Sequence, residues 1–438
     1  MNALEVGLVI LIGITILVWH TNKYHVLRLL LFTQWIVLFF QMILFDWRWP
    51  MIPFYLFTIY QSIKLLMKKG TYSFKYKLLS LFFLLLFFLL PSFLFPWNTL
   101  SMPTGAYKVG TQSFEVVDTS RDERWSNDEE HRRLMVQVWY PTDETANRRK
   151  ARYHDHPDLF MKEFTELNGI PGFLLQSFVK QKIPAYAKAP LLNRNQPFPV
   201  VFFSHGFGSN RSQNHFQVLE LASHGYIVIG IDHTYYSPGT LFPDSTNPGV
   251  INIEFSENTE VMDEYLYEWS NDAQSVLNWV ERLNNGGLQD LECLEQFVGQ
   301  IDLNKVAYIG HSFGGASASH TLAVDQRFQV GINMDGFPYG RAAELGIEQP
   351  FLTIISDTDL LVDESDGDYL AEYYRRITDI SGADNIISIK GTSHLDFSDF
   401  PLLSPITSWL GMTGKIPPWK IHRMINQITL EFLNDHLK

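Results

Sequence analysis

A serine between two glycines is the residue of this sequence best suited to covalent chemistry. Gly310, Ser312 and Gly314 form the pattern G-x-S-x-G, and the apolar segment 306–309, rich in β-branched and aromatic residues, comes directly before it. A serine aimed out of a tight strand-to-helix turn needs neighbours with almost no side chain, because strand and helix approach closely there. The pattern therefore predicts a nucleophilic serine between a strand and a helix whose N-terminus can stabilise an anion.

His394 is the residue best placed to act as the base that such a serine needs. A serine hydroxyl is a poor nucleophile at neutral pH until a base takes its proton and a third group orients that base. Where this turn occurs, the acid and the histidine follow later strands, in the chain order serine, acid, histidine. His394 follows the last predicted strand, 385–389, whereas His320 lies inside the helix after Ser312 and cannot face back toward it.

Two positions compete for the acid that would orient this histidine. Asp335 directly follows the predicted strand 330–334, and Asp357 and Asp359 follow the predicted strand 351–355. Both positions lie at the carboxyl end of a strand, so the spacing alone leaves the choice open. The alternative for each is an aspartate in a surface turn.

The negative charge that develops on an attacked carbonyl needs preorganised N–H donors. One expected donor is the backbone N–H of Phe313, the residue after the serine. The other should come from a loop after an earlier strand, and the glycine-containing segment 204–208 makes the N–H of Phe207 the best candidate. His205 in the same loop is expected to shape it through hydrogen bonds rather than to serve as a second base.

Apolar strands alternate with helices through the second part of the chain. Alternation of this kind predicts a mostly parallel sheet with helices on both faces. The segment 154–193, which contains several prolines, is predicted to be a helical insertion that could form part of a lid. The strands are predicted at 134–140, 198–203, 226–231, 306–309, 330–334, 351–355 and 385–389, with 302–305 as a turn, and the helices at 217–224, 263–283 and 421–437.

The length and the charge both divide the chain in two. A chain of 438 residues exceeds the usual size of a single hydrophobic core, so we expect two units, 1–100 and 101–438. Residues 1–100 hold eight lysines and arginines and two acidic residues, a net charge of +6. Since the whole chain carries −13, residues 101–438 carry −19.

The first unit is predicted to lie in a membrane. It contains four apolar stretches close to the ~20 residues that a helix needs to cross a bilayer, and tryptophans lie near their ends. Lysines and arginines concentrate between the first and second stretches and between the third and fourth, which places those loops in the cytoplasm. The sequence thus predicts a multi-pass protein of the cell membrane whose second unit is extracytoplasmic. The stretches are 3–19, 26–45, 51–67 and 78–97.

Several segments of the second unit match one family in order along the chain. With these segments, residues 101–438 resemble the platelet-activating-factor acetylhydrolase family, which includes the secreted, plasma-type lipoprotein-associated phospholipase A2 and bacterial relatives. The stretches before residue 100 depart from the secreted members. The matching segments are 103–111, 203–208 (Phe-Ser-His-Gly-Phe-Gly), 310–315 (Gly-His-Ser-Phe-Gly-Gly), 325–328, 331–340 and 390–399.

The resemblance implies an α/β-hydrolase fold and specific roles for the candidate residues. It selects Asp335 as the acid beside Ser312 and His394, and the amides of Phe207 and Phe313 as the oxyanion donors. It further implies calcium-independent cleavage of short-acyl or lipid esters through an acyl-serine intermediate.

The sequence and the resemblance together indicate which cofactors and partners to expect. No cofactor or metal is expected, since no ligand spacing such as H-E-x-x-H is present. The expected partners are a lipid-like or small ester and the bilayer, with no nucleic acid. Two other functions stay open: an acyltransferase on the same fold, and a non-catalytic binding module on a membrane anchor.

Overall fold

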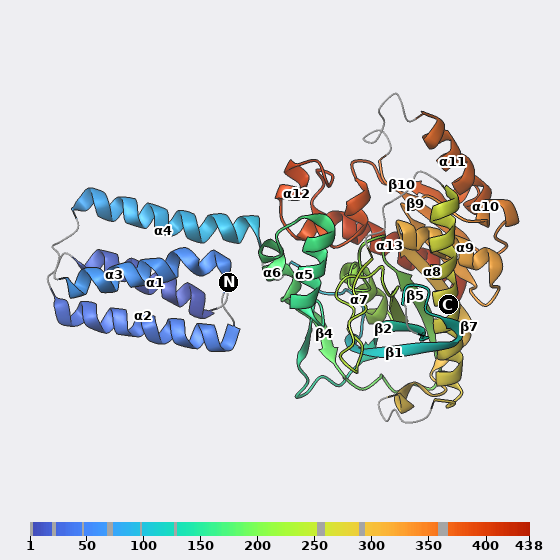
Figure 1. Cartoon of the computed structure of the whole chain (residues 1–438), viewed down its shortest axis with the longest axis horizontal. Coiled ribbons are helices and arrows are strands. Elements are labelled where there is room, and N and C mark those ends of the chain that lie inside the picture. The colour runs from blue at the N-terminus through green and yellow to red at the C-terminus, as the bar shows by residue number, and fades with distance from the viewer. Residues whose placement is uncertain are drawn as a thin grey trace. The chain divides into compact units, whose positions relative to one another are not determined.

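The computed structural model in Figure 1 describes most of the chain. By their internal contacts the residues form two compact units. The helical unit comprises 1–99 with the short segments 173–178 and 404–406, and the sheet unit comprises the remainder. The described residues are 3–19, 23–45, 48–67, 73–96, 99–126, 129–251, 259–288, 294–357 and 367–438.

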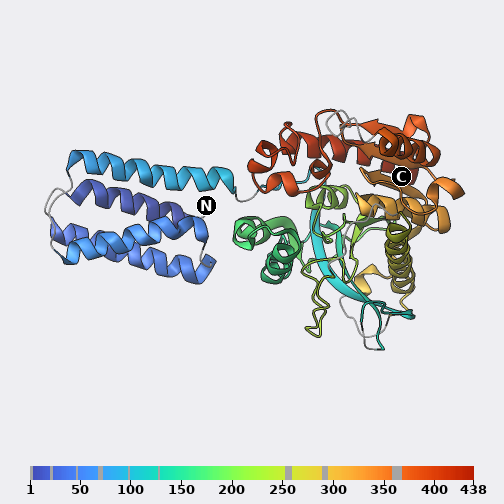
Figure 2. The ribbon, with the colours of Figure 1, turned by 45° about the horizontal axis from the view of Figure 1, so that its top comes forward.

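The α-helices between residues 3 and 94 lie side by side in the helical unit (Figures 1 and 2). Each matches one predicted apolar stretch, although the predicted end of the fourth, Trp97, lies outside the described residues. Within the described part of the chain, two of them, at Tyr24–Leu44 and Phe74–Leu94, are long and apolar enough to cross a membrane, and the first is a shorter apolar helix. The four helices are α1 (Ala3–Val18), α2 (Tyr24–Phe45), α3 (Ile52–Leu66) and α4 (Phe74–Leu94).

The sheet unit is built on one mixed sheet, with the strand order β10-β9-β8-β7-β5-β6-β2-β1-β4-β3. In the run β10-β9-β8-β7-β5-β6, each strand is parallel to the next one. Strand β2 then pairs antiparallel with β6, and β1 pairs antiparallel with β2. The strands are β1 (Lys108–Asp122), β2 (His131–Thr142), β3 (Lys150–Arg152), β4 (Lys182–Ala187), β5 (Phe198–Ser204), β6 (Ile227–Asp232), β7 (Ile301–His311), β8 (Val330–Met334), β9 (Phe351–Ile355) and β10 (Ile386–Ser388).

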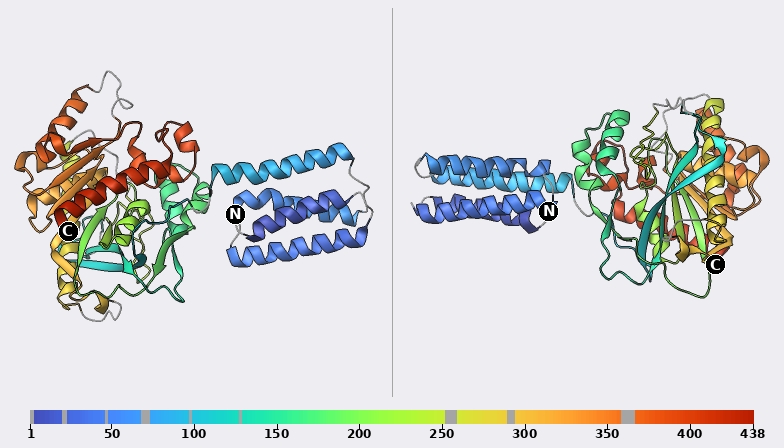
Figure 3. Two further views of the ribbon diagram at one scale, coloured as in Figure 1. Left: turned by 180° about the vertical axis from the view of Figure 1, so that it is seen from behind. Right: turned by 60° about the horizontal axis from the view of Figure 1, so that its bottom comes forward.

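Helices cover both faces of this sheet. Figure 1 shows α8 on the near face, and the view from behind in Figure 3 shows α13 crossing the other. Strands β5, β8 and β9 are buried along their whole length, as expected for parallel strands covered on both sides. The α-helices that follow α4 in the chain are α5 (Pro157–Asn168), α6 (Gly172–Val179), α7 (His215–Ser223), α8 (Thr259–Asn284), α9 (Phe313–Val324), α10 (Ala342–Leu345), α11 (Gly367–Ser381), α12 (Ile406–Trp409) and α13 (Pro418–Leu437), and residues 173–178 of α6 belong to the helical unit.

The predicted sheet is confirmed in its parallel part and differs elsewhere. The segment 302–305, predicted as a turn, belongs to β7, which pairs with β5 at Ile301 and Asp302 and again from Val306, with a shift of register between them. The predicted insertion 154–193 contains α5 and α6 but also β4, which joins the sheet beside β1. The long strand β1, cyan in Figures 2 and 3, was not predicted, because its polar residues break the apolar pattern.

Strand register brings the candidate segments to one edge of the sheet. Ser204 pairs with Gly310 across β5 and β7, and His311 pairs with Met334 across β7 and β8. The carboxyl ends of three neighbouring parallel strands therefore lie side by side. Loops that leave this edge are where ligands bind in open parallel sheets.

Candidate active site

Ser312 lies on a strained turn between β7 and α9. Its backbone has φ +56° and ψ −122°, a conformation that non-glycine residues rarely adopt. A Cβ on Gly310 would overlap the backbone of Gly314, and a Cβ on Gly314 would overlap the carbonyl of Ser204. The two glycines of the sequence pattern are therefore required by close backbone approach, and the predicted strand–turn–helix is confirmed.

A continuous chain of hydrogen bonds joins the three residues selected in the sequence. The Oγ of Ser312 lies 2.9 Å from Nε2 of His394, and Nδ1 of the same ring lies 2.8 Å from Oδ2 of Asp335. His394 begins the short 3-10 helix His394–Phe397 that follows β10. Three segments far apart in the sequence thus deliver a hydroxyl, an imidazole and a carboxylate to one place.

The carboxylate of Asp335 is held in position from two sides. Its Oδ1 accepts a hydrogen bond of 2.6 Å from the backbone N–H of Ser356, while Oδ2 faces His394. Burial raises the pKa of Asp335, but the hydrogen bond and charge of His394 and the Ser356 N–H outweigh burial, so the net pKa is lowered. Asp335 is therefore an anion at neutral pH, able to orient the histidine and to stabilise its protonated form.

The competing acids occupy different places. Asp357 accepts hydrogen bonds from Nζ of Lys390 at 3.0 Å and from the backbone N–H of Gly391 at 2.7 Å. It therefore anchors the start of the loop that carries His394. Asp359 lies outside the described residues.

The glycine loop after β5 lies directly against the serine. A Cβ on Gly206 would come within 3.2 Å of the Cβ of Ser312. The rings of Phe207 and Phe313 meet edge to face, with centroids 5.4 Å apart. The glycine loop and the first turn of α9, which carry the two predicted donors, thus lie next to each other at Ser312.

His205 is enclosed in this loop and is not exposed to solvent. Its Nδ1 lies 2.7 Å from the carbonyl oxygen of Gly206 and its Nε2 lies 2.7 Å from Oγ of Ser237. Burial, reinforced by His233, holds the pKa of His205 well below its ordinary value, so the ring is neutral. These contacts match a residue that shapes the loop.

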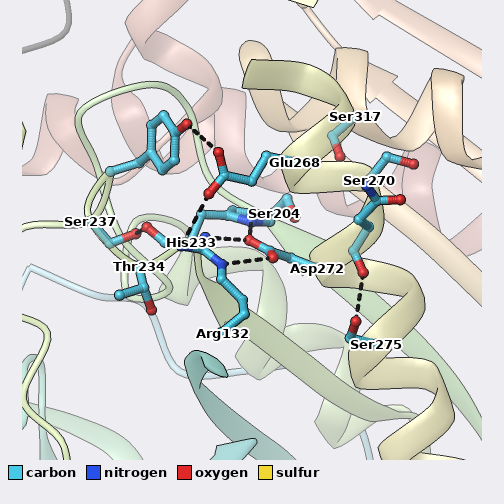
Figure 4. A network of polar contacts seen from close by, with 12 residues as sticks. Arg132, Ser204, His233, Thr234, Ser237, Glu268, Ser270, Asp272, Ser275 and Ser317 are labelled. Atoms are coloured by element: carbon cyan, nitrogen blue, oxygen red, sulfur yellow. Dashed lines mark hydrogen bonds and ion pairs between the residues drawn. The ribbon is translucent and has the colours of Figure 1, made fainter. Parts of the chain in front are cut away.

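A second Ser–His–Asp chain, not predicted from the sequence, starts at the end of β5 (Figure 4). The Oγ of Ser204 lies 2.9 Å from Nε2 of His233, and Nδ1 of His233 lies 3.0 Å from Oδ2 of Asp272. All three residues are completely buried. Because neither water nor substrate reaches Ser204, this chain is structural.

Arg132 compensates the buried carboxylates of that network. Its guanidinium donates to both oxygens of Asp272, at 3.1 and 2.8 Å, and pairs with Glu123 at 2.9 Å and Glu268 at 3.1 Å. Burial opposes the charge on Asp272, but the arginine and the His233 hydrogen bond outweigh it and lower the pKa of this carboxyl. Ser204, at the start of the glycine loop, is thereby tied to a fixed ionic cluster.

No group of three or more histidines, cysteines or acidic residues suited to a metal ion occurs among the residues that the structure describes.

The polar residues that sequence reasoning missed act through hydrogen bonds. The missed residues, such as His233 and Asp272, carry no motif. The signal for them was weak: a histidine just after β6, and an aspartate on the apolar face of α8.

The fold described above agrees with comparisons to known proteins. In structure, the chain is similar to a ferulic acid esterase from Streptomyces cinnamoneus, with a TM-score of 0.60 and 23% identity over 77% of this chain and 92% of the other. That likeness shows the α/β-hydrolase fold.

In sequence, two curated relatives cover most of the chain. A platelet-activating factor acetylhydrolase of Cavia porcellus is 29% identical over 371 residues, covering 78% of this chain and 79% of that protein. A probable 1-alkyl-2-acetylglycerophosphocholine esterase of Arthroderma benhamiae is 25% identical over 319 residues, covering 69% and 77%.

The family model described as "Platelet-activating factor acetylhydrolase, isoform II" matches residues 95–438. This match includes every element that positions the Ser312 site. The chain therefore belongs to the platelet-activating factor acetylhydrolase family and is a carboxylic ester hydrolase.

Proposed function

We propose that this enzyme cleaves short-acyl or lipid esters through an acyl-serine intermediate on Ser312 and needs no calcium ion. The observation that carries the proposal is the unbroken chain of hydrogen bonds from Ser312 through His394 to Asp335. Membership in the family supplies the reaction class, and the names of the two relatives, an acetylhydrolase and an alkyl-acetylglycerophosphocholine esterase, support the substrate class.

The geometry supports a two-step mechanism. The Ser312 hydroxyl gives its proton to Nε2 of His394 while its oxygen attacks the ester carbonyl, and Asp335 stabilises the imidazolium. The N–H groups of Phe207 and Phe313 receive the oxyanion. The imidazolium then protonates the departing alkoxide, which leaves as the alcohol and the acyl-serine remains. In the second half, His394 takes a proton from water while the water oxygen attacks the acyl carbon. The bond from that carbon to Oγ of Ser312 then breaks, the imidazolium returns its proton to Oγ, and the carboxylic acid leaves.

A buried aromatic cluster packs against the residue that follows the serine. Tyr236, Trp269, Phe313 and Tyr339 are buried in one apolar cluster, and the half-buried Phe207 packs against it. The ring of Trp269 lies 4.9 Å from that of Phe313. Because these rings are buried, they hold Phe313 and the glycine loop in place beside Ser312.

The substrate proposal is tested with phosphatidylcholine analogues whose second acyl group runs from acetyl to palmitoyl. We expect kcat/KM to be highest for the short acyl groups and to be unchanged by excess EDTA. Added alcohol acceptors distinguish hydrolysis from acyl transfer, because a transferase would convert most substrate to a new ester. Loss of activity in EDTA, or ester as the main product, would contradict the proposal.

We further propose that α1 to α4 together form a membrane-embedded anchor. Polar side chains are buried inside the four helices: Gln34 donates to Thr15 at 2.7 Å and accepts from Thr58 at 3.2 Å. Apolar side chains face outward, with Phe39 61% and Leu89 58% exposed. Polar residues inside and apolar ones outside suit lipid surroundings.

We propose that the sheet unit lies on the extracytoplasmic side, as the distribution of lysine and arginine predicts. The test uses Cys293→Ser, which removes the one cysteine of the chain, followed by Ser101→Cys or Thr71→Cys. A membrane-impermeant maleimide should label Ser101→Cys in intact cells, and Thr71→Cys only after the cells are broken. The reverse pattern would overturn the orientation.

A further inference from the structure

The side chain of Gln213 connects the two loops that meet at Ser312. Its Oε1 accepts a hydrogen bond of 2.6 Å from the backbone N–H of Gly206, in the glycine loop. Its Nε2 lies 2.6 Å from Nδ1 of His311, the residue before the serine. Nε2 of His311 lies 3.0 Å from the backbone carbonyl oxygen of His394. Three hydrogen bonds thus join Gly206 to His394.

The direction of every bond in this chain is fixed by its two ends. The Gly206 N–H can only donate, so the oxygen of the Gln213 amide faces it and the NH₂ faces His311. The His394 carbonyl can only accept, so His311 carries its proton on Nε2 and offers the Nδ1 lone pair to Gln213. A neutral glutamine and a neutral histidine satisfy all three bonds.

The surroundings of His311 keep it neutral. Its side chain is 1% exposed, and its ring lies 4.7 Å from that of His394. Burial, followed by the charge of His394, lowers the pKa of His311 to about 3. The ring therefore holds one proton at neutral pH, as the hydrogen-bond chain requires.

We propose that Gln213 and His311 are positioning residues, which hold the oxyanion donor of the glycine loop and the imidazole of His394 at a fixed spacing around Ser312. The inference rests on the proposed function, because it assigns those two groups their roles. The amide N–H of Phe207 is one residue from Gly206. A shift of Gly206 would therefore move that donor relative to the ring of His394.

Two substitutions separate this role from a merely structural one. Gln213→Leu removes both side-chain bonds at similar size, so both loops lose their link at every pH. Gln213→Glu keeps an acceptor for Gly206 but turns the donor to His311 into a second acceptor. The hydrogen bond between residue 213 and His311 then forms only when one additional proton binds, either to the introduced carboxylate or to Nδ1 of His311. Gln213→Glu should therefore add a protonation step that the wild type lacks.

Other titratable groups face this link and are shared by all variants. Asp335 and His394 lie next to His311, and the backbone N–H of Asp399 donates to the carbonyl of Gln213 at 2.9 Å. Burial raises the pKa of Asp399 to about 7. The ratio of variant to wild-type kcat at each pH cancels these contributions and isolates the new step.

With a short-acyl ester and the purified full chain, we expect Gln213→Leu to lower kcat about 10- to 100-fold at all pH values, with KM changed less than about threefold. For Gln213→Glu the kcat ratio to wild type should fall as pH rises, through one ionisation. Gln137→Leu is the matched control, since it removes a buried glutamine that bonds to Thr111 on the sheet. It should leave kcat unchanged.

Hydrogen exchange in the Ser312→Ala background tests the link without relying on catalysis. We expect Gln213→Leu to speed amide exchange in both 205–209 and 392–397, and Gln137→Leu to speed it in neither. Loosening of only one segment, or a flat kcat ratio for Gln213→Glu, would overturn the inference. If Ser312→Ala were fully active, the proposed function would fail instead, while the exchange result would still decide the link.

Discussion

Ser312→Ala should reduce kcat for a short-acyl ester by a factor on the order of 10⁵ to 10⁶, because the hydroxyl that forms the acyl-enzyme is gone. KM should change little, since the substitution removes one oxygen atom and leaves the glycine loop in place. The measurement is steady-state hydrolysis by the purified full chain, together with mass spectrometry after treatment with a fluorophosphonate. The wild type should gain one adduct at Ser312, and the variant none.

Ser319→Ala is the matched control for this change. Ser319 lies in the same helix, α9, and its hydroxyl donates to the carbonyl of Gly315 at 2.9 Å. We expect its kcat to stay within a few-fold of the wild type. Retention of more than about 1% of activity by Ser312→Ala, with protein of verified sequence, would rule out the acyl-serine mechanism.

Asp335→Asn should lower kcat about 10⁴-fold while the protein stays folded. The Ser356 N–H faces one oxygen of this carboxylate and would hold the oxygen of the new amide, which turns the NH₂ toward His394. The imidazole would then place its proton on Nε2 and could no longer accept one from Ser312. The measurement is kcat with circular dichroism of the same sample.

Asp357→Asn tests the alternative acid that the sequence left open. Asp357 accepts from Lys390 and Gly391, whereas the carboxylate within hydrogen-bond distance of the His394 ring is that of Asp335. We expect kcat of Asp357→Asn to fall less than about tenfold, through a less well-held loop. A larger loss for Asp357→Asn than for Asp335→Asn would reverse the assignment of the acid.

The strongly patterned parts of the sequence predicted their structure well. The strands 330–334 and 351–355 match β8 and β9 residue for residue, because parallel strands covered on both faces are continuous apolar runs. The chain order of serine, acid and histidine along such strands was enough to predict that Ser312 and His394 meet, with an acid from Asp335 or from the Asp357 and Asp359 pair. The acid itself was selected by the family resemblance and not by spacing.

What the sequence did not reveal are contacts between segments that carry no pattern of their own. Gln213 belongs to no sequence motif. Its importance is visible only in the folded structure, where its Nε2 lies 2.6 Å from Nδ1 of His311. Arg132 lies in a segment after Asp122 that is rich in charged residues, and such a segment is typical of the protein surface. In the structure, however, Arg132 is only 1% exposed. Side-chain burial of this kind depends on tertiary packing, which local sequence does not encode.

The buried chain of Ser204, His233 and Asp272 bears on how serine enzymes are recognised. A template search that asks only for a hydroxyl, an imidazole and a carboxylate at the right separations would match both this chain and the one at Ser312. Of these two serines, Ser312 has the strained elbow and access to solvent, and Ser204 is fully enclosed. Activity-based probes should therefore react with Ser312 and spare Ser204, and solvent access belongs in any geometric definition of such sites.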